Sequence, residues 1–210
     1  MTDVKQQICD VRRTIGTRVL EAGEARVLTI SQVYDTDAED LWDVVTSAER
    51  IPRWFLPISG ELREGGRYQL EGNAGGTITG CDKPRSYTAT WEFGDQVSWI
   101  EVRLSDAGAG RARFELEHVA HVSDELAEQF GPGALGVGWD GGLLGLANYL
   151  GDRDAVLDPK VAMAWMASAD GREFMRLSSD AWAQADIAAG TDPQRARTLA
   201  DNTYAAYTAG

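Results

Sequence analysis

The sequence predicts an α+β fold, in which a curved antiparallel sheet is covered by a long helix and followed by further helices. Three observations predict it. Residues 58–122 alternate apolar and polar positions between glycine-containing turns, residues 139–150 repeat apolar positions at helical spacing, and residues 158–210 contain no strand-like run. A sheet with one apolar face needs a covering layer, and the helix of residues 139–150 is the natural candidate.

The chain begins with a segment, residues 1–24, that we interpret as an N-terminal arm or an additional strand. Residues 14–20 and 26–34 are rich in β-branched residues and predict two strands, with EAGE (21–24) as their turn.

Helical spacing follows in residues 36–48. Thr36 or Asp37 is suited to cap this helix, and acidic residues occupy its first turn, where the helix dipole favours them. Pro52 limits a second helix to about one turn, which ends near Phe55.

The next segment predicts a series of strands, at residues 60–62, 67–71, 77–81, 86–93, 97–104 and 111–122. Because side chains alternate along a strand, Tyr87, Ala89 and Trp91 share one face of their strand, and Phe114 and His118 share one face of theirs. Trp42 and Trp99 alternate away from these faces. We expect them beneath the C-terminal extension or at a dimer contact.

Trp139, Leu143, Leu146 and Leu150 recur on one face of the covering helix. Three glycines, at 141, 142 and 145, lie inside it, and each costs about 1 kcal/mol relative to alanine. Such a helix must be held by tertiary contacts, or must allow another group to approach closely.

Charge and composition exclude several classes of function. The chain has 210 residues, with 20 Lys and Arg against 33 Asp and Glu, a net charge of −13. That sign argues against partners such as nucleic acid and anionic membrane surfaces. The two cysteines, Cys9 and Cys81, lie far apart, which argues against a disulfide framework. With no signal-peptide core and no long apolar run, the sequence predicts a cytoplasmic protein without membrane insertion.

Four segments in order resemble the SRPBCC (START-like, helix-grip) superfamily, in the branch similar to activators of the heat-shock-protein-90 ATPase. They are RVLTISQVYDTDAEDLWDVVTSAERIPRWF, GELREGGRYQLEG, the run from Tyr87 to FELEH, and GWDGGLLGLANYL. The resemblance covers about residues 25–150. It implies a sheet that grips a C-terminal helix, with a cavity between them that holds a hydrophobic ligand.

The resemblance sets the expected domains and functions. Residues 25–151 would form the helix-grip domain, and 152–210 a helical extension that packs on it or on a partner chain, as in a homodimer. The first hypothesis is a protein that binds a small apolar molecule without a cofactor. The alternatives are a co-chaperone-like partner module and, third, a cyclase or hydrolase.

The expected ligand-binding residues share inward positions on the strands, the short helix and the covering helix: Trp54, Tyr68, Ile78, Trp91, Phe114, His118, Trp139 and Leu143. Their aromatic rings either line a pocket or fill a closed core, and both alternatives stay open. His118 is a polar anchor, a general base, or a hydrogen-bonded core residue. No metal site is expected, since His118 and His121 fall on opposite faces of a strand. No catalytic residue is expected either, since a base needs an orienting partner and the spacing identifies none.

Overall fold

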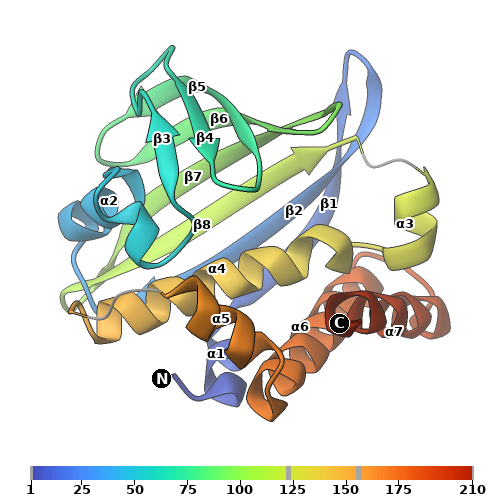
Figure 1. Ribbon diagram of the computed structural model, residues 1–210. Coiled ribbons are helices and arrows are strands. Elements are labelled where there is room, and N and C mark those ends of the chain that lie inside the picture. The colour runs from blue at the N-terminus through green and yellow to red at the C-terminus, as the bar shows by residue number, and fades with distance from the viewer. Residues whose placement is uncertain (1, 122–123, 155–157, 210) are drawn as a thin grey trace. The chain divides into compact units, whose positions relative to one another are not determined.

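The computed structural model describes residues 2–121, 124–154 and 158–209. Figure 1 shows the elements, which follow one another as α1 (Val4–Asp10), β1 (Arg12–Leu20), β2 (Gly23–Tyr34), α2 (Ala38–Thr46), the 3-10 turn η1 (Ile51–Arg53), β3 (Ile58–Gly60), β4 (Arg67–Leu70), β5 (Gly75–Asp82), β6 (Ser86–Phe93), β7 (Gln96–Gly108), β8 (Arg111–Ala120), α3 (Asp124–Phe130), α4 (Gly133–Gly151), α5 (Pro159–Met166), α6 (Ala169–Ala188) and α7 (Pro193–Thr208).

The eight strands form one sheet in the order β1-β2-β8-β7-β6-β5-β4-β3. Each neighbouring pair from β3 to β8 is antiparallel. The predicted α+β class is therefore confirmed, with a curved antiparallel sheet and C-terminal helices consistent with a helix-grip fold. In the described part of the chain, no helix is long and apolar enough to cross a membrane.

The chain divides into two compact units, which are described separately. The first unit comprises Met1–Ile30, His121–Leu144 and Leu157–Gly210, and the second comprises Ser31–Ala120 and Gly145–Val156. In the first unit, α6 packs against α1, β1, α5 and α7. Phe174 and Trp182 of α6 are buried there, so elements of the same chain cover part of its apolar stripe.

Helix α4 begins at Gly133, earlier than the sequence indicates. The sequence does not predict its first turns because they are rich in glycine. These glycines admit close neighbours instead of ending the helix. A Cβ at Gly136 would overlap the indole of Trp182, and a Cβ at Gly133 would meet the side chain of Thr203. Tertiary contacts in the first unit therefore stabilise a segment of low helix propensity.

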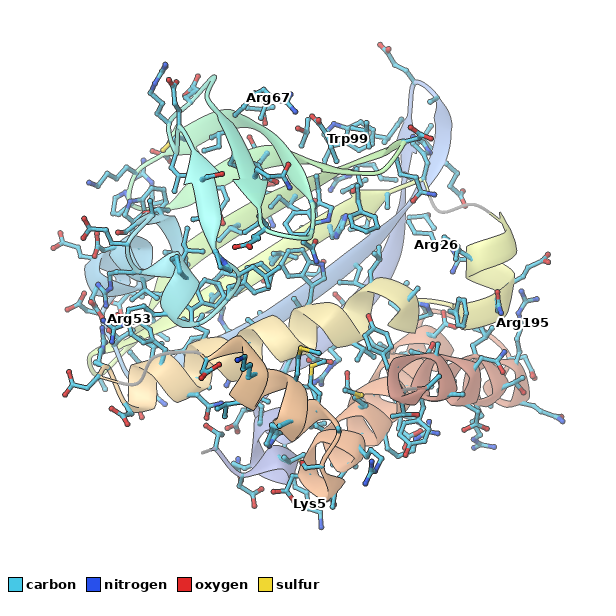
Figure 2. The ribbon with its side chains drawn as sticks, viewed as in Figure 1. Lys5, Arg26, Arg53, Arg67, Trp99 and Arg195 are labelled. Atoms are coloured by element: carbon cyan, nitrogen blue, oxygen red, sulfur yellow. The ribbon has the colours of Figure 1, made fainter. Side chains whose placement is uncertain are left out.

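In the second unit, α2 packs against β7 and β8. Its acidic first turn is present as predicted, and the side chain of Asp37 caps the helix by accepting from the Asp40 amide. The expectation for Trp42 is wrong, because its ring is buried and meets Tyr87 edge-to-face at 6.3 Å. Trp99, labelled in Figure 2, is 38% exposed on the opposite face of the sheet.

Candidate functional site

The strands of the second unit bring part of the predicted site into one row. Ile78 pairs with Ala89, Ala89 with Ile100, and Ile100 with His118, across β5, β6, β7 and β8. Ala89, Ile100 and His118 are buried, whereas the flanking positions along β6 and β7 are more exposed. We name this side of β6–β8 the inner face; its residues are Tyr87, Ala89, Trp91, Ser98, Ile100, Val102, Leu104, Ala112, Phe114, Leu116 and His118.

His118 is the buried ionisable group of the inner face, with 2% of its surface exposed. Its Nε2 lies 2.8 Å from the hydroxyl of Ser98, and that hydroxyl donates to the carbonyl oxygen of Trp91 at 3.0 Å. Because a hydroxyl has one proton, Nε2 of His118 is the donor in this pair. The ring also meets Trp91 edge-on, at 6.0 Å between centroids.

Burial lowers the pKa of His118 to about 4. The imidazole is therefore neutral at pH 7. A general base works best when its pKa lies near the operating pH, and the pKa of His118 lies well below 7. This places His118 closer to the anchor or core role than to catalysis.

The depressed pKa makes the stability of the protein dependent on pH. Unfolded His118 takes up a proton near its ordinary pKa of 6.5, whereas the folded form does so only near pH 4. The unfolded state binds more protons between these values, so stability should fall by about 2–3 kcal/mol as pH drops from 7 to 4. Urea unfolding of the protein and of His118→Gln at both values measures this.

Because the chain has two histidines, an NMR titration can check the pKa of His118 directly. In an NMR titration His118 should stay neutral until pH approaches 4, and His121→Gln, which removes the other histidine, should leave that curve unchanged. A His118 that titrates near pH 6.5 would show that its surroundings do not exclude the charged form.

The other sheet residues of the predicted site are placed as follows. Phe114 is buried on the inner face, two inner positions along β8 from His118, and Trp91 is half-buried on β6. Tyr68 is buried on β4, and its hydroxyl donates to the carbonyl oxygen of Thr90 at 2.7 Å. Burial, and to a lesser degree the nearby charge of Glu92, raise the pKa of Tyr68, so this hydroxyl stays protonated.

Trp54 lies where η1 meets the end of α4. Its indole donates to the carbonyl oxygen of Val44 at 3.1 Å and stacks on Phe55 at 5.4 Å. Its own carbonyl oxygen occupies the space that a Cβ of Gly145 would need. One of the three glycines noted in the sequence therefore serves close approach of backbone, whereas Gly141 has no neighbour within 4 Å of such a Cβ.

These two glycines form a matched pair for mutation. Gly145→Ala should lower the free energy of unfolding by about 1–3 kcal/mol, since overpacking against the Trp54 backbone outweighs the gain in helix propensity. Gly141→Ala should raise it by up to about 1 kcal/mol. Chemical denaturation of both variants measures the difference. Equal effects of the two changes would contradict the close contact.

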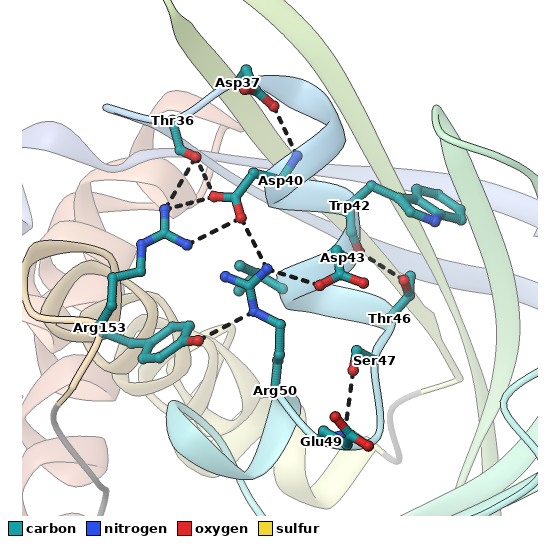
Figure 3. Close-up of polar contacts among 12 residues, drawn as sticks. Thr36, Asp37, Asp40, Trp42, Asp43, Thr46, Ser47, Glu49, Arg50 and Arg153 are labelled. Atoms are coloured by element: carbon teal, nitrogen blue, oxygen red, sulfur yellow. Dashed lines mark hydrogen bonds and ion pairs between the residues drawn. The ribbon is translucent and has the colours of Figure 1, made fainter.

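Three arginines surround the ring of Tyr149 near the end of α4, with their guanidinium carbons 5.5–5.9 Å from its centroid: Arg50, Arg53 and Arg153. Figure 3 shows Arg153 and Arg50 approaching one carboxylate, Asp40, with shortest distances of 2.6 and 2.9 Å.

Two carboxylates of this cluster, Asp40 and Asp43, pair with two of its three arginines, Arg50 and Arg153. Partial burial raises the pKa of Asp40, but hydrogen bonds from Arg153, Thr36 and Arg50 outweigh it and hold the pKa well below its ordinary range. Arg50 also pairs with Asp43 at 2.8 Å and donates to the Tyr149 hydroxyl at 3.2 Å. The cluster therefore links α2 to the end of α4, and its carboxylates occupy the guanidinium groups of Arg50 and Arg153.

The remaining predicted site residues, Trp139 and Leu143, belong to the first unit. Leu143 is buried and Trp139 half-buried on α4. Between them in sequence, the carboxylate of Asp140 is 1% exposed and accepts two hydrogen bonds from Arg13, at 2.7 and 3.0 Å. Ser178 and Trp182 donate to the same carboxylate at 2.6 and 3.0 Å.

The sequence analysis missed this network, whose signal is a lone carboxylate inside an apolar helix. Burial raises the pKa of Asp140, while Arg13, Ser178 and Trp182 oppose that rise. Because both carboxylate oxygens of Asp140 accept hydrogen bonds from protein groups, the network stabilises the first unit and offers no open position for chemistry. Among the described residues, no three His, Cys, Asp or Glu side chains are grouped so as to hold a metal ion.

Comparison with known proteins decides the family. The model of the family described as Activator of Hsp90 ATPase homolog 1-like protein matches residues 35–151, more than half of the chain. The chain belongs to this family. The activator-like family is part of the SRPBCC superfamily, so the resemblance drawn from the sequence is confirmed.

Solved structures agree with this assignment. CalU16 from Micromonospora echinospora is similar in its crystal structure, at 31% identity and TM-score 0.65, covering 86% of this chain and 99% of that one. Its solution structure gives 34% identity and TM-score 0.68, covering 86% and 97%. EF2215 from Enterococcus faecalis, at 13% identity and TM-score 0.53 over 78% and 92% of the chains, shares the fold. A search of curated proteins finds no match.

Proposed function

We propose that this activator-like protein binds a small apolar molecule in a cavity between the inner face of its sheet and the end of α4, without a cofactor. The observation that supports the proposal is the composition of the inner face. Its side chains are aliphatic and aromatic, apart from Tyr87 and the hydrogen-bonded pair of His118 and Ser98. Ligand sites for small molecules combine an apolar lining with few polar groups in this way.

The state of His118 favours binding over catalysis. A neutral imidazole whose Nε2 proton is already held by Ser98 is a poor base at pH 7. It can orient a polar substituent of a ligand, while Phe114, Trp91 and Ile100 supply apolar contact. A ligand with a charged group at this depth would be disfavoured by the cost of burying an unpaired charge.

The uncharged fluorescent probe N-phenyl-1-naphthylamine tests the proposal. It should bind with saturation at one site per chain and shift the NMR signals of His118 but not of His121. Ala89→Leu, which extends a side chain from the centre of the inner face, should remove this binding. Ala164→Leu is the matched control at an exposed position of α5 and should bind as the unmodified protein does.

Binding that survives Ala89→Leu unchanged would place the probe elsewhere and contradict the proposal. Absence of saturable binding, together with native mass spectra free of any retained small molecule, would favour a closed core instead.

A further inference from the structure

The face of the sheet opposite the inner face contains a groove of about 410 Å³ over β6, β7 and β8, within the second unit. Its size falls in the range of small-molecule sites, about 300–1,000 Å³. Its lining is charged and polar, in contrast to the inner face, and includes Arg85, Glu101, Arg103, Ser105, Arg113 and Glu115.

Strand register explains why these side chains meet. Arg103 of β7 pairs with Glu115 of β8, and Ser105 pairs with Arg113. Since side chains alternate along a strand, the odd-numbered residues 101, 103 and 105 of β7 project on one side, together with 113 and 115 of β8. The groove is thus built on paired strands, which hold its side chains at fixed spacing.

Two of the three arginines are occupied by carboxylates. Arg103 donates to both oxygens of Glu101 at 2.9 and 2.5 Å, and to Glu115 at 3.2 Å. Arg85 forms a two-pronged pair with Asp82 at 2.9 and 2.8 Å. Their guanidinium charges are therefore balanced within the protein, and Arg103 is hydrogen-bonded to both glutamates of the groove.

Arg113 differs from both. Within the part of the chain that the structure describes, its guanidinium makes one hydrogen bond, a long one of 3.5 Å to the hydroxyl of Ser31, and no ion pair. It is half-buried on β8, beside Ser105 on the neighbouring strand. A partly buried guanidinium with unused donors in a groove is suited to a planar or tetrahedral oxyanion, which it can bind through two parallel hydrogen bonds.

We propose that this groove binds the carboxylate or phosphate group of a small polar molecule, with Arg113 as the charged anchor and Ser105 as a hydroxyl donor. This site is distinct from the apolar site of the inner face and does not depend on it. Because the groove is open to water and one residue supplies most of the charge, the dissociation constant for a simple anion should be on the order of 1 mM.

The test is a titration followed by amide NMR at constant ionic strength, with inorganic phosphate, citrate and acetate as separate probes. Signals of residues 103, 105 and 113 should shift with saturation, while the side-chain signals of His118 stay in place. Comparison of the three probes distinguishes a phosphate from a carboxylate ligand. Arg113→Gln should weaken binding about tenfold or more. Arg113→Lys keeps the charge but loses the guanidinium that forms two parallel hydrogen bonds, and it should weaken binding less.

Arg111→Gln is the matched control, since Arg111 is an exposed arginine of the same strand that does not line the groove. It changes the net charge equally and should alter the affinity less than about twofold. Equal weakening by Arg113→Gln and Arg111→Gln would show general charge attraction and overturn the proposal. So would an absence of saturable shifts up to about 20 mM of every probe. If Arg113→Gln fails to fold, Arg113→Lys and Ser105→Ala give the same comparison.

Discussion

Replacing Asp140 with alanine is expected to lower the free energy of unfolding by about 3–5 kcal/mol, because it leaves the guanidinium of Arg13 buried without its partner. The side chain of Arg13 is 5% exposed, so water cannot replace the carboxylate. The donors of Ser178 and Trp182 would lose their acceptor in the same variant. Urea unfolding of the full chain measures the loss.

Two controls separate this network from ordinary charge effects. Asp180→Ala removes an exposed carboxylate that pairs with Arg176 on α6, and should cost at most about 1 kcal/mol. Replacing Arg13 and Asp140 together with apolar residues of similar size should cost less than Asp140→Ala alone, since no charge is left unpaired. A similar loss in Asp140→Ala and Asp180→Ala would contradict the buried network.

Trp182→Ala should lower stability by about 3–5 kcal/mol, the cost of emptying a large buried site. The indole is 0% exposed and fills the space left by the missing side chain of Gly136. Trp99→Ala removes the same side chain from a position that is 38% exposed and should cost clearly less. Denaturation monitored by circular dichroism measures both. A loss at Trp182 no larger than that at Trp99 would mean that α6 does not pack as described.

The stability losses of Asp140→Ala and Trp182→Ala are expected to be coupled. Trp182 donates to Asp140, so the variant with both substitutions should lose less stability than the sum of the losses of the two single variants. Strict additivity would indicate that the hydrogen bond contributes nothing to the packing of α4 against α6.

The sequence predicts the strands well because alternation is a local signal. The strands predicted from residue 67 onward overlap β4–β8, and β6 has its predicted bounds, whereas the strand predicted at residues 60–62 shares only Gly60 with β3. The sequence predicts α4 only from residue 139, because the glycines of its first turns have low helix propensity and their role depends on Trp182 and Thr203, far along the chain. Gly171 lies in the first turn of α6, where its amide donates to the Ser168 cap.

The candidate site was predictable to a similar depth. Alternation puts Phe114 and His118 on one face, but the row that joins Ile78 to His118 depends on the pairing register of four strands, which no single segment encodes. The same holds for Arg113 and Ser105 in the outer groove. The network of Arg13, Asp140 and Ser178 joins three distant segments, and only the folded first unit brings them together.

The proposed ligand cavity requires space over the inner face, and the unfolding free energy of Ala89→Leu tests this most directly. Ala89 is 2% exposed, at the centre of the row that ends at His118. If a cavity lies above it, the larger side chain should be accommodated with a change below about 0.5 kcal/mol, similar to Ala164→Leu. If side chains fill that space, overpacking should cost about 1–3 kcal/mol, and this result would contradict a ligand cavity at the inner face.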